Sequence, residues 1–517
     1  MDPIISLPHI RVFSLPGHGD FAVFVQEVLG WAQDESIIKL CSIIGDCAKS
    51  VIVEDNYVDK DYKSMLSAHY SKIFAPTDKT VVRLLLFNSD IRFSHDLNEI
   101  DTRHQEHFIG YLTCYYVGYE IIGRTLLDPN KLGHNHRLCS TDFTCYFLGS
   151  RLNVRGFPYI QQDTNVMACA QASIWMMMRY MSTRYHEYKE FYPADILNAD
   201  TDFSRGRHIP SSGLTLHQMS NVMTHLGFYP IVRIIEAGKE DIFHESLYKY
   251  VESGIPIVVG MNSRQHAIVL LGHTNEYDVN ISEPDIQAVL AKKGYIPSYY
   301  FLKAYVCHND AWLPYEIIPK QKYSSGPKMY QVAGCSFKYD EMKVEDISVM
   351  VVPLYEKIFL EGSPVENKAW TILNDNYLGI VPTLDKASIK YKIDGPLILR
   401  TYLTSSRAYK EFKKRKGTDV VASIYRQTSM SKFIWIVEFT VEKLYNSKDP
   451  KIFGEILFDA TASQHEPANL CIHYPGYLYV NRREEHLKNN RLVDGIDLRT
   501  IGNVNFEYSM FVHNLGD

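Results

Sequence analysis

One segment near the middle of the chain is apolar on nearly every side. It begins at Cys169 and reads Cys-Ala-Gln-Ala-Ser-Ile-Trp-Met-Met-Met-Arg-Tyr, ending at Tyr180. A helix with this profile has to be buried on most of its faces, because its apolar side chains cover more than a single stripe. We therefore predict a helix that other elements surround, with Cys169 at its first residue.

Three apolar runs later in the chain predict strands. Ile255–Met261 and His266–Leu271 flank an Asn-Ser-Arg-Gln turn, so we expect them to pair. A further strand, Phe301–His308, ends at Asn309 and Asp310. This order places a histidine at the start of one strand and an acid at the end of a strand that can lie beside it.

Elsewhere helices and strands alternate without a repeat, which predicts the α+β class. Thr215 and Gln218 form a capping box at the start of one helix. Helical spacing marks Phe21–Trp31, Ile37–Val53, Leu214–Leu226 and Glu240–Glu252, and strand-like runs mark Thr80–Phe87, Tyr111–Gly118, Leu397–Leu403 and Phe433–Phe439.

The composition is that of an ordinary globular protein. Of the 517 residues, 46% are hydrophobic and 22% are charged. This length predicts roughly three domains of about 150 residues each. We place them at residues 1–155, 156–320 and 321–517, each α+β, with the central one starting at Gly156-Phe-Pro-Tyr.

Several function classes are disfavoured. The net charge of −6 argues against general nucleic-acid binding. No apolar run is long enough to cross a bilayer, and Met1 to His9 has no basic segment followed by an apolar one, so we expect a cytoplasmic protein. The nine cysteines are an odd number and fit reduced thiols. The oligomeric state is not predictable from these features.

We expect no metal and no cofactor. His134 and His136 precede Cys139, but this loop has no CxxC pair and too few ligands for a zinc site.

The pairing of Cys169 with His266 indicates nucleophilic chemistry. A thiol is activated by a helix N-terminus, which lowers its pKa, and by a neighbouring base. Gln162 lies seven residues before Cys169 and can supply an amide donor to an oxyanion.

The central segment 156–320 resembles the C39-like (bacteriocin-processing, double-glycine) branch of the papain-like cysteine peptidases. The residues that carry the resemblance are Gln162 with Cys169-Ala-Gln-Ala-Ser, the pair of strands from Gly254 to His273 that includes His266, and the strand that ends in Asn309-Asp310. It implies a papain-like peptidase domain flanked by N-terminal and C-terminal α+β domains.

The resemblance also implies a role for each residue. Cys169 looks like the nucleophile, His266 like its base, Asp310 like the residue that orients the imidazole, and Gln162 like the side chain of the oxyanion hole. The chain departs from the family in having Ala-Gln after Cys169 and an insertion near residues 274–299. Glu283 and Asp278 therefore remain alternatives to Asp310, and Gln161 remains an alternative to Gln162.

The sequence thus predicts a cysteine peptidase or isopeptidase that acts on a peptide or protein through an acyl-thioester on Cys169. Two other functions fit the same residues: a catalytically inactive papain-like binding module, and an acyltransferase that passes the acyl group to an amine. The substrate, the pathway and any activating signal are not predictable.

Overall fold

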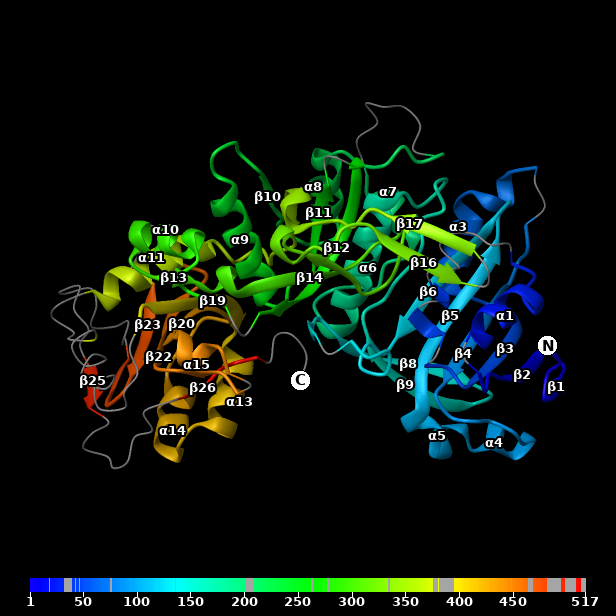
Figure 1. Cartoon of the computed structure of the whole chain (residues 1–517), viewed down its shortest axis with the longest axis horizontal. Helices are drawn as coiled ribbons and strands as arrows, with labels where there is room; N and C mark the ends of the chain where they lie inside the picture. The colour runs from blue at the N-terminus through cyan, green and yellow to red at the C-terminus, as the bar shows by residue number, and fades with distance from the viewer. Residues whose placement is uncertain are drawn as a thin grey trace. The chain divides into compact units, whose positions relative to one another are not determined.

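The structure of the protein is a computed structural model. It describes residues 1–517 except 18, 32–39, 42, 46, 75–76, 135, 201–208, 262–263, 277–278, 333–334, 375–379, 381–394, 448, 464–467, 481–493, 498–507 and 513–517. Helices and several β-sheets make up the chain (Figure 1), which confirms the α+β class predicted from the sequence. Within the described residues, no helix combines the length and apolar character needed to cross a membrane.

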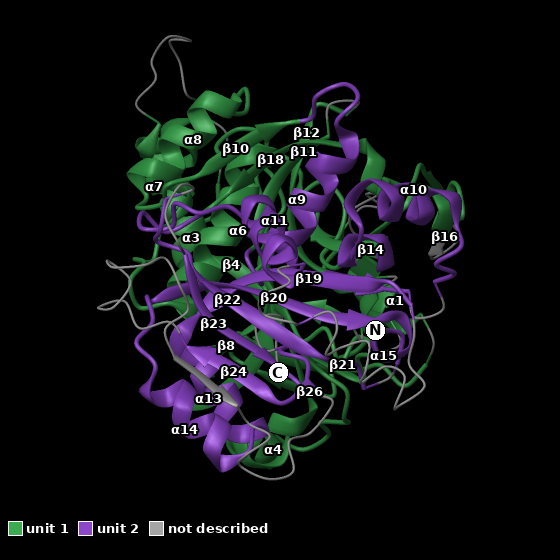
Figure 2. Cartoon of the chain, turned by 90° about the vertical axis from the view of Figure 1, so that its left-hand side faces the viewer, with its two compact units in different colours: residues 1–234, 256–272, 304–353 green, residues 235–255, 273–303, 354–517 purple. Residues whose placement is uncertain are grey.

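The chain divides into two compact units (Figure 2). Unit 1 contains Met1–Ile234, Pro256–Gly272 and Ala304–Pro353, and unit 2 contains Ile235–Ile255, His273–Lys303 and Leu354–Asp517. These units do not follow the segments 1–155, 156–320 and 321–517 expected from the sequence, since both internal boundaries of that division fall inside unit 1. The chain passes between the units several times. No change of composition and no Gly-rich or Pro-rich linker in the sequence marks these crossings.

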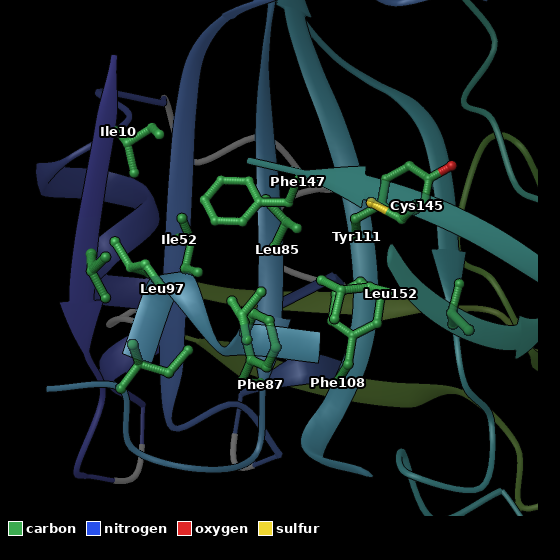
Figure 3. Packing of buried hydrophobic residues seen from close by; sticks show 14 of the residues in the cluster. Ile10, Ile52, Leu85, Phe87, Leu97, Phe108, Tyr111, Cys145, Phe147 and Leu152 are labelled. Carbon is green, nitrogen blue, oxygen red and sulfur yellow. The ribbon is translucent and has the colours of Figure 1, made fainter. Parts of the chain in front are cut away.

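The N-terminal part of unit 1 is an antiparallel sheet whose strands pair in sequence order. Its strands are β1 (Ile5–Leu7), β2 (Ile10–Ser14), β3 (Ser50–Tyr57), β4 (Val81–Phe87), β5 (Phe108–Tyr116) and β6 (Glu120–Leu127). The hairpin of β8 (Thr141–Phe147) and β9 (Ser150–Gly156) contributes to the same core, where Phe147 and Cys145 join Leu85 and Tyr111 (Figure 3). Buried and exposed residues alternate along β8, as in a strand that covers a core with one face.

The second sheet of unit 1 carries the histidine strand. Its strands lie in the order β10 (Ile231–Ile234), β18 (Ile347–Val352), β11 (Ile257–Met261), β12 (His266–Asn275), β14 (Leu302–His308) and β15 (Glu316–Pro319), with β7 (Arg137–Leu138) also paired to β12. Helix α6 (Cys169–Arg184) packs against β11. Ile174, Trp175 and Met176 in this helix are fully buried, which confirms the prediction of a surrounded helix.

Helices complete unit 1. They include α1 (Asp20–Glu27), α3 (Lys60–Ala68), α4 (Ser94–Asn98), α5 (Ile100–Arg103), α7 (Pro193–Ala199) and α8 (Leu216–His225). The predicted capping box of α8 is present, since Gln218 N–H donates to Thr215 Oγ1 at 3.3 Å and Thr215 N–H donates to Gln218 Oε1 at 3.0 Å. The predicted helix Ile37–Val53 is wrong at its C-terminal end, because Ser50–Val53 belong to β3. Pairing of these residues with β2 and β4 outweighs their helical spacing.

Unit 2 is built on a sheet that confirms the predicted strands Leu397–Leu403 and Phe433–Phe439. Its strands lie in the order β13 (Ile296–Pro297), β19 (Leu397–Ser405), β20 (Phe433–Val441), β22 (Gly454–Asp459), β23 (Asn469–Tyr474), β24 (Tyr477–Val480) and β25 (Asp494–Asp497). Its helices include α9 (Glu240–Glu252), α10 (Pro284–Lys293), α11 (Gly362–Leu373), α13 (Ser406–Lys416), α14 (Asp419–Gln427) and α15 (Glu442–Tyr445). The bounds of α9 are those predicted from the sequence.

Candidate active site

Cys169 is the first residue of α6 and is partly exposed. Ala168 before it is extended, and its carbonyl oxygen accepts the first helical hydrogen bond, from Ala172 N–H at 2.9 Å. The N–H groups of Cys169, Ala170 and Gln171 therefore have no acceptor within the helix. Such a helix start carries a partial positive charge, which favours a thiolate and offers donors to an oxyanion.

Two side chains hold α6 in place. Ser173 Oγ donates to the carbonyl oxygen of Ala267 at 3.3 Å. Ala267 is the residue directly after His266 in β12. Trp175 Nε1 donates to Oδ1 of the buried Asp61 in α3 at 3.1 Å. Helix α6 is thus tied both to β12 and to the N-terminal part of unit 1.

His266 opens β12 opposite Met261 of β11, and its side chain is 15% exposed. The side chain of Cys169 lies next to its ring and interacts with it. Burial lowers the pKa of His266, but the neighbouring Cys169 side chain and the charge of Asp310 outweigh burial and raise the pKa to about 9. The imidazole is therefore protonated at neutral pH, the state that stabilises a neighbouring thiolate.

Asn309 directly follows β14 and holds the other side of the ring. Its Oδ1 lies 2.8 Å from Nε2 of His266 and also accepts from Ala311 N–H at 3.2 Å. Because a backbone N–H can only donate, the amide oxygen of Asn309 faces the ring and Nε2 carries a proton. Nδ1 is then the ring nitrogen that remains for Cys169. We assigned no role to Asn309 from the sequence, since an amide beside the predicted acid gives no separate signal.

Asp310 is fully buried beside the same ring nitrogen. Its Oδ1 lies 3.6 Å from Nε2 of His266, which is a charge contact longer than a hydrogen bond. Among the described residues, neither carboxylate oxygen has a hydrogen-bond partner on another residue. Burial raises the pKa of Asp310 to about 6, although the charge of His266 acts to lower it. Asp310 therefore lies beside His266, as predicted, but the hydrogen bond to the ring comes from Asn309.

The two candidate glutamines differ in their surroundings. Gln161 is buried, and its Oε1 accepts from the backbone N–H of Ile122 in β6 at 2.9 Å. This contact anchors Gln161 to the sheet. Gln162 is half-buried, and its assignment to the oxyanion hole stays a prediction.

The loop between Gln162 and Cys169 is organised by Asp163, which we did not single out from the sequence. Its buried Oδ1 accepts from the N–H groups of Asn165, Val166 and Met167 at 3.1, 2.8 and 2.7 Å. Tyr70 donates to the other carboxylate oxygen. The preference of aspartate for local hydrogen bonds in turns is the only sequence signal for this role.

Glu283 and Asp278 were the alternatives to Asp310. Glu283 directly precedes α10 in unit 2, whereas His266 belongs to unit 1. Asp278 lies outside the described residues. In the described part of the chain, no group of three or more His, Cys, Asp or Glu side chains is arranged to hold a metal ion.

Comparisons of this chain with models of protein families, with curated proteins and with solved structures find no match. The geometry of Cys169, His266 and Asn309 is therefore the basis for any statement about function.

Proposed function

We propose that this protein is a papain-like cysteine hydrolase, related to the C39-like branch, that cleaves a peptide or isopeptide bond. The observation that carries the proposal is that Cys169, the first residue of α6, lies next to His266, whose Nε2 is held by Asn309 at 2.8 Å. A nucleophile, a base within hydrogen-bond reach and a third residue that orients the base form the arrangement expected of covalent catalysis.

In the first half of the reaction, the proton of the Cys169 thiol resides on Nδ1 of His266. The thiolate attacks the carbonyl carbon of the amide, and the carbonyl π-electrons move to oxygen. The N–H of Cys169 and the side chain of Gln162 are the proposed donors to this oxyanion. His266 then gives its Nδ1 proton to the leaving amine, which leaves an acyl-thioester on Cys169.

In the second half, a water molecule replaces the amine. His266 Nδ1 takes a proton from the water while the water oxygen attacks the thioester carbon. Collapse of the second tetrahedral adduct releases the carboxylic acid and returns the thiolate paired with His266. Asn309 accepts from Nε2–H throughout, so the imidazole keeps one orientation in both halves.

Cys169 differs from the buried thiols of the chain. Burial raises the pKa of Cys41, Cys139 and Cys471 to about 12 in each case. The same cause raises the pKa of Cys114, Cys145 and Cys307. At neutral pH these thiols stay protonated and enclosed, whereas Cys169 is partly exposed beside a protonated imidazole.

This difference gives a direct test. The folded protein is treated with less than one equivalent of iodoacetamide at neutral pH, and the modified cysteines are located by peptide mass spectrometry. We expect Cys169 to be alkylated first and His266→Ala to slow that reaction. If Cys169 reacts no faster than the buried cysteines, the proposal is wrong.

A reactive Cys169 without turnover would instead favour the inactive binding module. Turnover is assayed with a fluorogenic peptide library, with Cys169→Ala as the blank. Mass analysis of the products, with an added amine, distinguishes hydrolysis from acyl transfer, because only transfer leaves the acyl group on the amine.

A further inference from the structure

We propose that Glu316 is a positioning residue that keeps the amide oxygen of Asn309 turned toward His266. The proposal rests on the function proposed above, since it concerns the orientation of the same imidazole. Glu316 opens β15, where it pairs with Cys307 of β14, and it is buried.

The contacts of Glu316 fix the direction of the amide. Its Oε2 accepts from Nδ2 of Asn309 at 2.9 Å, while Asn309 Oδ1 accepts from His266 and Ala311 on the opposite side. An asparagine amide is nearly symmetric in shape and can rotate by a half-turn with little steric cost. A reversed amide would point its N–H₂ at the Nε2–H of His266 and its oxygen at a carboxylate, so both contacts would become repulsive.

Glu316 is itself held by an aromatic side chain. Tyr339, the last residue of β17 (Cys335–Tyr339) in the hairpin with β16 (Lys328–Val332), donates its hydroxyl to Oε1 of Glu316. The Tyr339 ring stacks on Trp312, with centroids 3.8 Å apart and planes at 15°. Burial raises the pKa of Tyr339, so its hydroxyl remains a donor. Tyr339 therefore holds Glu316 by a hydrogen bond, Glu316 holds Asn309, and Asn309 holds His266.

Several other titratable groups surround this chain of contacts. The side chains of Cys307, Tyr159 and Tyr330 also face the charge of Glu316, and burial raises the pKa of each. The guanidinium of Arg264 lies over the Tyr339 ring, 5.8 Å from its centroid. On the His266 side, Cys169 and Asp310 are the groups that interact with the ring charge. Removing the acceptor at Glu316 should therefore act on His266 through Asn309.

The test compares two replacements of similar volume. Glu316→Met removes the acceptor, whereas Glu316→Gln keeps an oxygen that can accept from Nδ2 of Asn309. Glu341→Met is the matched control, because Glu341 is buried in the same unit but binds Lys328 at 2.7 Å and Ser324 at 2.8 Å instead. The rate of Cys169 alkylation is measured as a function of pH in each full-length variant, with thermal unfolding as a check on the fold.

We expect Glu316→Met to move the acid limb of the alkylation profile to higher pH and to slow alkylation on that limb by about tenfold, as for loss of a hydrogen bond to a charged group. Glu316→Gln should restore most of the wild-type profile, and Glu341→Met should leave it unchanged. Equal shifts in Glu316→Met and Glu341→Met, or none in either, overturn the proposal. If Glu316→Met does not fold, an unshifted profile in Tyr339→Phe overturns it as well.

Failure of the proposed function can be distinguished from failure of the positioning role of Glu316. Failure of that function appears in the wild type, as a Cys169 that reacts no faster than the buried cysteines. Failure of the positioning role appears as a fast wild-type Cys169 whose profile does not depend on Glu316.

Discussion

The Oδ1 atom of Asn309 lies 2.8 Å from Nε2 of His266, so an amide holds the imidazole by a hydrogen bond. The carboxylate of Asp310 lies 3.6 Å from the same nitrogen and contributes charge without a hydrogen bond. In the proposed mechanism, the two tasks that a single acid performs in many triads, orientation and charge stabilisation, would therefore be divided between these adjacent residues.

Asn309→Ala should lower turnover more than Asp310→Asn. The alanine variant loses the acceptor that fixes the ring, and we expect a fall in kcat/KM on the order of tenfold or more. The Asp310→Asn variant keeps the hydrogen bond of Asn309 and loses only the neighbouring charge. Both variants are measured on one substrate, and a larger loss in Asp310→Asn would return the orienting role to the acid.

Asp310→Asn should also stabilise the protein at neutral pH. Burial raises the pKa of Asp310 from 3.8 to about 6. A carboxyl whose pKa is raised in the folded state contributes stability below its unfolded pKa, and that contribution is lost as the pH rises through its folded pKa. Above that range the buried charge is a cost, so its removal should raise the free energy of unfolding by on the order of 1–3 kcal/mol.

Urea denaturation of wild type and Asp310→Asn checks this expectation. The difference between the two proteins should be largest at neutral pH and should shrink as the pH falls from about 6 to about 4, below which the wild-type carboxyl is protonated in both states. A variant that is less stable than wild type at neutral pH would show that the interaction with His266 offsets the cost of burying the Asp310 carboxylate.

The sequence predicted the elements of the site better than their contacts. The all-apolar helix beginning at Cys169 and the paired strands before and after His266 depend on local periodicity, and they were predicted closely. The roles of Asn309, Asp163 and Glu316 depend on which polar atoms meet in the folded chain. Asp310 and Asn309 stand side by side in the sequence, and only the turn after β14 determines which of them reaches the hydrogen-bond distance.

The division into units was less predictable for a related reason. Residues 235–255 and 273–303 belong to unit 2, although they flank the strands that carry the site in unit 1. No Gly-rich or Pro-rich linker marks these crossings. Ser50–Val53 are a smaller example of a structure that local sequence does not predict. These residues form a strand because they pair with two neighbouring strands.

Cys169→Ala should abolish turnover and leave stability nearly unchanged. Cys169 is partly exposed, so truncating its thiol removes little buried apolar area and should change the free energy of unfolding by less than about 1 kcal/mol. Activity and thermal unfolding are measured on the same preparation. Normal turnover by the variant would mean that Cys169 is not the nucleophile.

Trp175→Phe should destabilise unit 1, because it removes the indole N–H and also leaves a cavity at a fully buried position. The indole N–H donates to the buried Asp61, and its loss leaves a buried acceptor with one partner fewer, which costs about 1–3 kcal/mol. Chemical denaturation measures this loss. Trp370→Phe, in unit 2, is a control for the change of residue type, since Trp370 lies on the partly exposed face of α11.

The contribution of His266 to stability should disappear in alkaline solution. Its pKa is raised from 6.5 to about 9, so the folded state binds a proton more tightly than the unfolded state does. The resulting stability is fully present below pH 6.5 and is lost as the pH rises through about 9. Compared with His266→Asn, wild type should therefore gain on the order of 2 kcal/mol at the acid end of this range and little at the alkaline end. His217→Asn is the matched control for the change of residue type, because His217 is exposed on α8. A wild-type advantage at His266 that does not vary with pH would mean that the imidazole gains no proton affinity from Cys169 and Asp310.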